Sequence, residues 1–322
     1  MLRVFATAFA AVIVVLGVAA CQDELPTTPA GPVISWSTAP ASDEEYLAVI
    51  AAVRSIDPCA IIPRGELAAI GTVVKVEARS IDTCEATLDS AEFGKSTILL
   101  WSLGISRDPV EGSDTTEPPT RIRDATMVVD REAGAAEQGS MTRTCMAIGQ
   151  FPATVLLNVN VVTPADQLPC ALAKKVMPNA LDVLRTAPAA GTSPDTPKTV
   201  LSGADPCAVL DSLGTTTPAS KHYLFGCVFQ YKGSYVDLQY AYEGELIATG
   251  GTPVLEVNGH RGYDRRSTTE TYWYSVIVGP AFGTADPKTT MGRQLPVARL
   301  MGRDPEVLRE VLQHVAELFP AS

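Results

Sequence analysis

Two stretches of the chain are near copies of each other: Asp57-Pro58-Cys59-Ala60-Ile61-Ile62 and Asp205-Pro206-Cys207-Ala208-Val209-Leu210. Aspartate is a good helix N-cap and proline is tolerated at the first helical position, so each stretch predicts a short helix whose first turn presents the cysteine. Another cysteine follows 25 residues later in the first copy and 20 residues later in the second. The recurrence indicates a duplicated module in a chain of 322 residues, a length that favours two domains.

The cysteines fit a disulfide framework. Seven are present, and six remain when Cys21 is set apart. The second half contains only two, which should pair with each other, and the repeat then assigns a matching pair to the first half. A metal site is the alternative, but no Cys-x-x-Cys motif and no nearby histidine accompany these cysteines. The expected pairs are Cys59 with Cys84, Cys145 with Cys170, and Cys207 with Cys227.

The start of the chain has the features of a bacterial lipoprotein signal. Arg3 supplies a basic beginning, residues 4–18 form an apolar stretch too short for a stable transmembrane helix, and Val18-Ala19-Ala20-Cys21 resembles a lipobox. We therefore expect residues 1–20 to be a signal peptide that is removed, and Cys21 to carry a diacylglyceryl group. Two acyl chains give durable anchoring in a membrane. The alternative is an ordinary cleaved signal with a chance cysteine.

Composition divides the remainder of the chain. Residues 21–41 are rich in Pro, Thr, Ala and Ser and predict a flexible stalk. Two domains are expected over 42–185 and 200–320, joined by a linker of similar composition over 186–199. Each domain should contain a helix, antiparallel strands and a closing helix. The predicted fold class is therefore α+β, with two similar domains, each an antiparallel β-sheet packed with helices.

Hydrophobic spacing places the individual elements. A capping box at 42–45 predicts the first helix, and closing helices are expected over 168–184 and from Asp304 onward. Asn258-Gly259 predicts a type I′ hairpin. Alternating apolar residues predict strands, whose ranges are 97–103, 126–130, 153–162, 223–231, 236–242, 254–257 and 271–278.

The chain resembles actinobacterial cell-envelope lipoproteins of unknown function. The features that carry the resemblance are the lipobox, the polar stalk and the signature Asp-Pro-Cys-Ala followed by an apolar pair, here in tandem. The resemblance covers both halves, and only the short motif in it is specific. It implies small extracytoplasmic domains of the sensor type and a PsbP-like α/β sandwich, and it implies no catalytic residues. The first half departs from a minimal copy by the additional Cys145 and Cys170 and by an acidic loop over 107–124.

No catalytic or cofactor-binding motif is present in the sequence. It contains no Gly-x-Ser-x-Gly, no His-Glu-x-x-His, no Walker loop and no Gly-x-Gly-x-x-Gly, so we expect no cofactor and no resident metal. The three histidines offer few candidates for a triad or a metal site. A formal net charge of −11 opposes binding to the phosphate backbone of nucleic acids.

The strongest local candidate for ligand binding is the stretch 258–266. It gathers cationic and aromatic side chains in an acidic protein, and arginine suits carboxylate or phosphate groups. The alternative is a solvated basic hairpin strand that neutralises nearby Asp and Glu. Most tyrosines fall between Tyr223 and Tyr274, where they suit either core packing or a stacking surface. The candidate ligand-binding residues are His260, Arg261, Tyr263, Arg265 and Arg266.

These observations predict a membrane-anchored protein on the extracytoplasmic side of the cell membrane, acting as a non-catalytic binding or sensor-type module. Its expected partners are the membrane, through the lipid anchor, and an envelope protein, a cell-wall fragment or a small ligand. One alternative is an envelope hydrolase whose acid and base are Asp or Glu residues. Another is a passive structural or assembly factor.

Overall fold

The structure is a computed structural model, and it describes residues 34–110, 118–130, 140–265, 271–283 and 293–321. The segment Pro32–Ser322 forms one compact unit. The predicted signal peptide, Cys21 and residues 21–33 of the predicted stalk lie outside the described residues. Within the described part of the chain, no helix combines the length and apolar character needed to cross a membrane.

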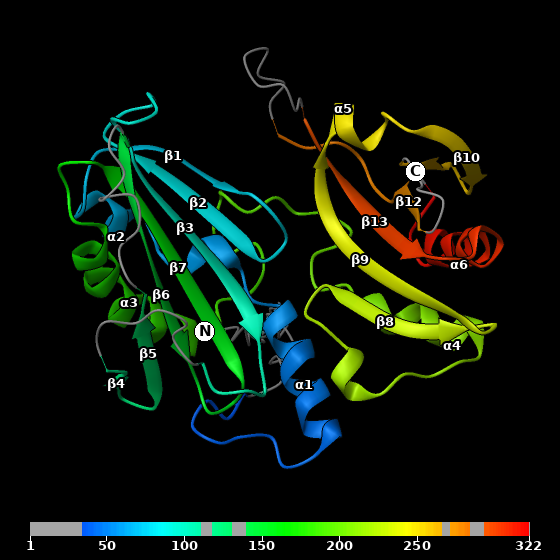
Figure 1. The fold of residues 1–322 in the computed structure, drawn as a ribbon, viewed down its shortest axis with the longest axis horizontal. Coiled ribbons are helices and arrows are strands. Elements are labelled where there is room, and N and C mark those ends of the chain that lie inside the picture. Colours follow the sequence, from blue (N-terminus) through cyan, green and yellow to red (C-terminus); the bar gives the residue numbers. More distant parts are fainter. Residues whose placement is uncertain (1–33, 111–117, 131–139, 266–270, 284–292, 322) are drawn as a thin grey trace, which may run out of the picture. The chain divides into compact units, whose positions relative to one another are not determined.

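In the described part of the chain, thirteen strands form two sheets in which every neighbouring pair is antiparallel (Figure 1). The first sheet, in the order β1-β2-β3-β7-β6-β5-β4, comprises β1 (Val73–Ala78), β2 (Thr83–Leu88), β3 (Thr97–Ile105), β4 (Thr120–Ile122), β5 (Ala125–Val129), β6 (Thr142–Gln150) and β7 (Val155–Pro164). The second sheet, in the order β10-β11-β12-β13-β9-β8, comprises β8 (Gly226–Tyr231), β9 (Ser234–Gly244), β10 (Thr252–Val257), β11 (His260–Asp264), β12 (Tyr272–Ile277) and β13 (Gln294–Gly302).

The two sheets have the same strand order once the edge strand β1 is set aside. The first then runs β2-β3-β7-β6-β5-β4, and the second, read from its other end, runs β8-β9-β13-β12-β11-β10. In each half the first two strands form a hairpin, and the last strand returns to pair with the second. The predicted α+β class with two similar antiparallel sheets is therefore confirmed.

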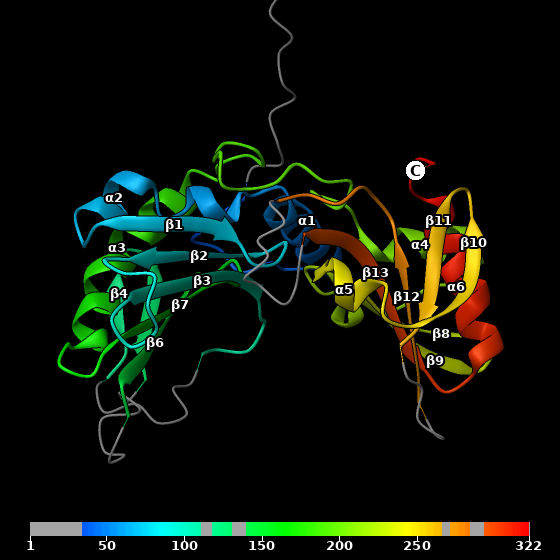
Figure 2. The ribbon, with the colours of Figure 1, turned by 90° about the horizontal axis from the view of Figure 1, so that it is seen from above.

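The helices lie against these sheets. They are α1 (Asp43–Arg54), α2 (Arg64–Ala68), α3 (Pro169–Arg185), α4 (Val209–Leu213), α5 (Glu245–Ala248) and α6 (Pro305–Glu317), with 3₁₀ turns η1 (Pro58–Ala60), η2 (Pro206–Ala208) and η3 (Ala219–Lys221). The closing helix of each half packs on its own sheet, α3 against β6 and β7, and α6 against β12, β13 and β10 (Figure 2). Asp304 caps α6 by accepting bonds from the Glu306 and Val307 amides, as its sequence predicts.

Both Asp-Pro-Cys stretches form 3₁₀ turns capped by their aspartates. The carboxylate of Asp57 accepts from the Cys59 amide at 3.1 Å, and that of Asp205 accepts from the Cys207 amide at 2.9 Å. The second turn continues into α4, which ends at Gly214 with a left-handed φ of 61°. The sequence therefore predicted the turn and its cap correctly, with 3₁₀ geometry in place of an α-helical first turn.

Three disulfides connect helical segments to strands, and they join the pairs that the sequence predicts. Their S–S distances lie between 2.05 and 2.08 Å. In both halves the disulfide of the motif attaches the capped turn to a strand of the adjacent sheet, β2 or β8. The third disulfide attaches α3 to β6. The pairs are Cys59–Cys84, Cys145–Cys170 and Cys207–Cys227.

The two halves share their apolar cores. Ile81, in the β1–β2 turn of the first half, belongs to the core of the second half. In return, Ala219 and Leu224 of the second half belong to the core of the first. Phe225 packs against both. Apart from these exchanged residues, each sheet has a core of its own, and the exchange joins the two cores within the compact unit Pro32–Ser322.

A buried arginine reinforces this exchange. Arg54, at the end of α1, is only 5% exposed. Its guanidinium donates to the carbonyl oxygens of Leu224 at 2.7 Å and Tyr223 at 3.2 Å, and it pairs with the carboxylate of Asp205 at 2.8 Å. Burial lowers the pKa of Arg54, and Asp205 acts in the opposite direction. These partners all belong to the second half of the chain.

Two segments differ from the sequence expectation. The predicted strand 223–231 begins only at Gly226, and Tyr223 is 49% exposed, because the carbonyls of Tyr223 and Leu224 turn toward Arg54 instead of a neighbouring strand. The predicted linker 186–199 is bonded to the first half: its Ser193 amide donates to Asp57 at 2.8 Å, and Asp195 pairs with Arg64 at 2.6 Å.

Candidate functional site

The predicted ligand-binding hairpin is present, but its residues do not form one site. The Asn258-Gly259 turn has left-handed φ values of 52° and 81°, as a type I′ turn requires, and joins β10 to β11. A Cβ at Gly262 would meet Leu312 of α6 at 3.0 Å, so alternate residues of β11 face α6. His260 lies on that side, whereas Arg261 and Tyr263 lie on the opposite side. Arg266 lies outside the described residues.

His260 is a core residue in this fold. It is 1% exposed, and its Nδ1 lies 3.0 Å from the carbonyl oxygen of Ile277. Its Nε2 is buried without a hydrogen-bond partner. A ligand arriving from solution therefore has no route to His260 on the described surface, and the prediction that it contacts a ligand is not supported by its position.

The face of the second sheet opposite α6 carries polar and aromatic side chains in register. One row across the strands contains Tyr263, Ser275, Arg299 and Gln239. The next row contains Trp273, Met301 and Asp237. Part of this face is covered by α5, where Ala248 packs with Leu295 and Val297.

A buried carboxylate organises the charged residues of this face. Glu243 of β9 is 6% exposed and bonds Arg265 at 2.7 Å as well as Arg299 of β13. The predicted candidate Arg265 is therefore engaged in an internal ion pair. This ion pair agrees with the alternative interpretation of the stretch 258–266, in which its basic residues neutralise nearby Asp and Glu. Because one carboxylate bonds two guanidiniums, the cluster ties the end of β11 to two central strands of the sheet.

A hollow of about 500 Å³ lies at the β8–β9 side of the same face. This volume falls within the range of roughly 300–1,000 Å³ that is common for small-molecule sites. Its walls are partly aromatic and partly acidic, and residues of the first half, including the turn at Ile81, complete them. Below, "the hollow" means the space lined by Ser80, Ile81, Asp82, Leu103, Gly104, Ile105, Tyr223, Leu224, Phe225, Gly226, Val228, Tyr235, Asp237, Gln239, Tyr240 and Ala241.

The two carboxylates of the hollow have different surroundings. Asp82 accepts hydrogen bonds from the hydroxyl groups of Ser80 and Thr83. Asp237 has only long contacts to the amide nitrogen of Gln239, at 3.3 and 3.5 Å. Burial raises the pKa of the Asp237 carboxyl, and the contact with Gln239 offsets this only in part. Asp237 is therefore a partly desolvated acid with weak internal partners.

The duplicated topology allows these positions to be compared between the sheets. In the second half, Cys227 of the motif disulfide lies opposite Leu238 on the neighbouring strand β9. In the first half, Cys84 of the motif disulfide lies opposite Trp101 on the neighbouring strand β3. Counting from Leu238 and Trp101, the second sheet has a tyrosine, an aspartate and a glutamine where the first has isoleucine, leucine and serine, and both sheets have a small residue at the fourth position. The matched pairs are Tyr235 with Ile98, Asp237 with Leu100, Gln239 with Ser102 and Ala241 with Gly104.

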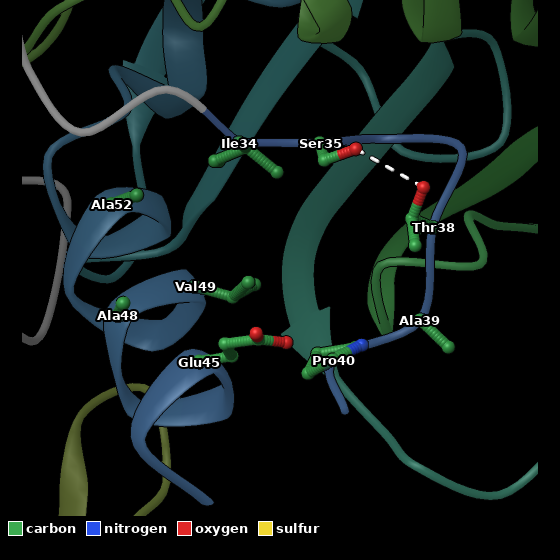
Figure 3. Close-up of a pocket in the computed structure, with 9 residues that line it drawn as sticks. All are labelled: Ile34, Ser35, Thr38, Ala39, Pro40, Glu45, Ala48, Val49 and Ala52. Carbon is green, nitrogen blue, oxygen red and sulfur yellow. Dashed lines mark hydrogen bonds between the residues drawn. The ribbon is translucent and has the colours of Figure 1, made fainter. Parts of the chain in front are cut away.

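Two of the further hollows lie against helices of the first half. One of about 190 Å³ lies between α1 and the segment 34–40, and Figure 3 shows Val49 and Glu45 directed toward that segment. Among its polar groups, Ser35 donates to Thr38 at 3.2 Å (Figure 3). Glu45 accepts from the amide of the neighbouring Ala41 at 2.7 Å. The other, of about 330 Å³, lies between α2 and α3. Within the described residues, no group of three or more His, Cys, Asp or Glu is placed to hold a metal ion.

The comparisons with known proteins leave the family open. No protein-family model matches the chain, and no curated protein matches it. A solved structure, the crystal structure of DynU16 from the dynemicin biosynthetic locus, aligns with 87% of this chain and 91% of that chain at 12% sequence identity, with a TM-score of 0.14. A likeness at this TM-score carries no argument about fold or function.

Replacing Glu243 with alanine should destabilise the protein by about 2–3 kcal/mol, because two partly exposed guanidiniums then lose the buried carboxylate that they share. The matched control is Glu245→Ala, because Glu245 pairs with Arg293 at 3.2 Å on the surface. That loss should cost about 1 kcal/mol or less. Chemical denaturation of the two variants measures both values, and equal effects would contradict this account of the cluster.

Proposed function

We propose that the protein is a non-catalytic binding module, anchored by a lipid on Cys21 to the extracytoplasmic side of the cell membrane, and that the hollow is its ligand site. The single observation that carries the proposal is a space of about 500 Å³ with aromatic and carboxylate walls on a sheet face that α6 does not cover. The lipobox supports the anchor. A PsbP-like arrangement of each half is part of the same proposal.

The hollow also bears on the alternative functions, and it favours the proposed one. A passive structural factor does not require a concave surface, whereas a binding module does, and half-exposed Tyr223 and Tyr235 line the one described here. An envelope hydrolase is favoured by one observation, because Asp82 and Asp237 line the same space and burial raises the pKa of Asp237. Asp82, however, is bonded to two neighbouring hydroxyl groups, and Asp237 contacts an amide. Neither acid has a partner that would orient it for proton transfer, which supports binding.

The anchor is tested by replacing the proposed lipidation site. The wild-type protein should sediment with the membrane fraction of expressing cells, and Cys21→Ser should appear in the soluble fraction because no acyl chains remain to hold it. Intact-mass measurement of the wild-type protein should show a lipid on residue 21. An unmodified Cys21, or identical fractionation of the two proteins, would sink the proposal of an anchor.

Binding without turnover is tested by filling the hollow. Ala241 lines it, so Ala241→Trp should occupy much of its volume. Envelope extracts fractionated by size should contain a small molecule that raises the melting temperature of the wild-type protein and leaves that of the variant unchanged. The same fractions should emerge chemically unaltered by mass spectrometry. Conversion of a component by the wild-type protein but not by Asp237→Asn would establish the hydrolase instead.

A further inference from the structure

The walls of the hollow are anionic and aromatic. Asp82 and Asp237 supply two carboxylates, and Tyr223 and Tyr235 supply phenol rings that are about half exposed. Among the described residues that line the hollow, none is lysine, arginine or histidine. A ligand carrying negative charge would meet two like charges and no counter-charge, whereas a cation would meet both carboxylates and the faces of tyrosine rings.

The arginines beside these walls are already engaged with other carboxylates. Arg54 bonds the carbonyls of Tyr223 and Leu224, and it also pairs with Asp205 at 2.8 Å. Arg299 lies opposite Gln239 in the sheet and bonds the buried Glu243. Arg54 therefore has the carboxylate of Asp205, whereas Arg299 shares that of Glu243 with Arg265, and in the described residues neither guanidinium forms an ion pair with Asp82 or Asp237.

One acid and one ring are placed to act together. Asp237 and Tyr235 are two residues apart on β9, so their side chains emerge on the same face of the sheet, and both line the hollow. Within the described residues, the carboxylate oxygens of Asp237 have hydrogen-bond contacts only to Gln239, and these are long. On the first sheet, the matched positions hold Leu100 and Ile98. The pairing of acid and aromatic ring therefore distinguishes the second copy of the module from the first.

We propose that the hollow binds an organic ammonium cation, with its charged head between Asp237 and the ring of Tyr235 and its apolar part against Ile81, Leu103 and Ile105. This inference rests on the proposed function and names the chemical class of its ligand. Ion pairing with a partly desolvated carboxylate and cation–π attraction to tyrosine both favour such a head group. The aliphatic wall matches the carbon substituents that distinguish an organic cation from a hydrated metal ion.

Three probes of the same shape separate charge from size. Choline carries a quaternary ammonium, 3,3-dimethyl-1-butanol replaces the nitrogen with carbon, and 3,3-dimethylbutanoate carries a negative charge. Titration calorimetry with the purified protein should detect choline at least tenfold more tightly than the neutral alcohol and should detect no binding of the anion. Saturable choline binding should be abolished by Ala241→Trp, which fills the hollow.

Four variants assign the binding to the proposed groups. Asp237→Asn should weaken choline binding about tenfold and leave binding of the neutral alcohol unchanged, because the substitution preserves shape and removes charge. The control Asp166→Asn removes an equal charge from an exposed turn outside the hollow and should change nothing. Tyr235→Phe should retain choline binding because the ring remains, whereas Tyr235→Leu should lose about threefold or more.

The outcomes distinguish this inference from the function on which it rests. Equal or tighter binding of the alcohol or the anion, lost in Ala241→Trp, would overturn the cation class and leave a binding function at the hollow. Choline binding that survives both Asp237→Asn and Ala241→Trp would place the cation elsewhere and overturn the inference. If no probe binds and no envelope fraction stabilises the wild-type protein, both the inference and the proposed function fail.

Discussion

The structure depends on the burial of one guanidinium. An arginine removed from water must have its donors bonded and its charge compensated, and an unpaired buried charge costs several kcal/mol. Arg54 meets this requirement with two carbonyl oxygens and one carboxylate, from Leu224, Tyr223 and Asp205. Helix α1 supplies the cation, and the second half of the chain supplies every one of these partners. The buried guanidinium therefore has its hydrogen bonds and its counter-charge only when both halves are folded.

The second motif aspartate consequently has two roles. Asp205 caps the turn that presents Cys207, as its position before proline dictates, and it also neutralises Arg54. In the first copy the equivalent Asp57 bonds the Ser193 amide and the hydroxyl of Thr196 instead. The motif aspartate of the first copy thus contacts the segment that connects the two halves. The motif aspartate of the second copy contacts Arg54 in the first half. A repeat that is locally identical has acquired different long-range partners.

The same interaction shapes the hollow. Tyr223 and Leu224, whose carbonyls bond Arg54, line the hollow, and Ile81 from the first half enters the core of the second beside it. The binding proposal therefore depends on a wall that neither half supplies alone. The opposite wall, on β9, carries Asp237 and Tyr235 at positions where the first sheet has apolar residues.

Local patterns in the sequence predicted the elements that have local causes. The capped turns, the closing helix α6, the Asn258-Gly259 hairpin and strand β9 all follow from capping, turn chemistry or strict alternation. Strand β13 was not predicted, because it contains Pro296 and is buried on both faces along 295–298, so alternation is lost. Without β13, the partnership of Arg299 with Glu243 could not be anticipated.

The candidate site was only partly predictable for a similar reason. The sequence identified Arg265 and the aromatic richness of the second half. It could not place Asp237 in a hollow, since that space requires β9, the turn at Ile81 and the segment at Tyr223 to meet in three dimensions. It assigned Tyr223 to a strand because nothing local indicates that its carbonyl bonds an arginine far away in the chain.

The most direct test of the account is native-state hydrogen exchange on Arg54→Met, which removes the buried charge and keeps an unbranched apolar side chain. The account predicts that backbone amides of both sheets lose protection together, by about 1–3 kcal/mol, because two carbonyl oxygens lose their donor. Arg64→Met is the control, because Arg64 forms a half-exposed pair with Asp195 and should change protection by about 1 kcal/mol or less. Loss of protection confined to α1 in the Arg54 variant, with both sheets unchanged, would contradict the claim that this arginine makes the two halves one folding unit.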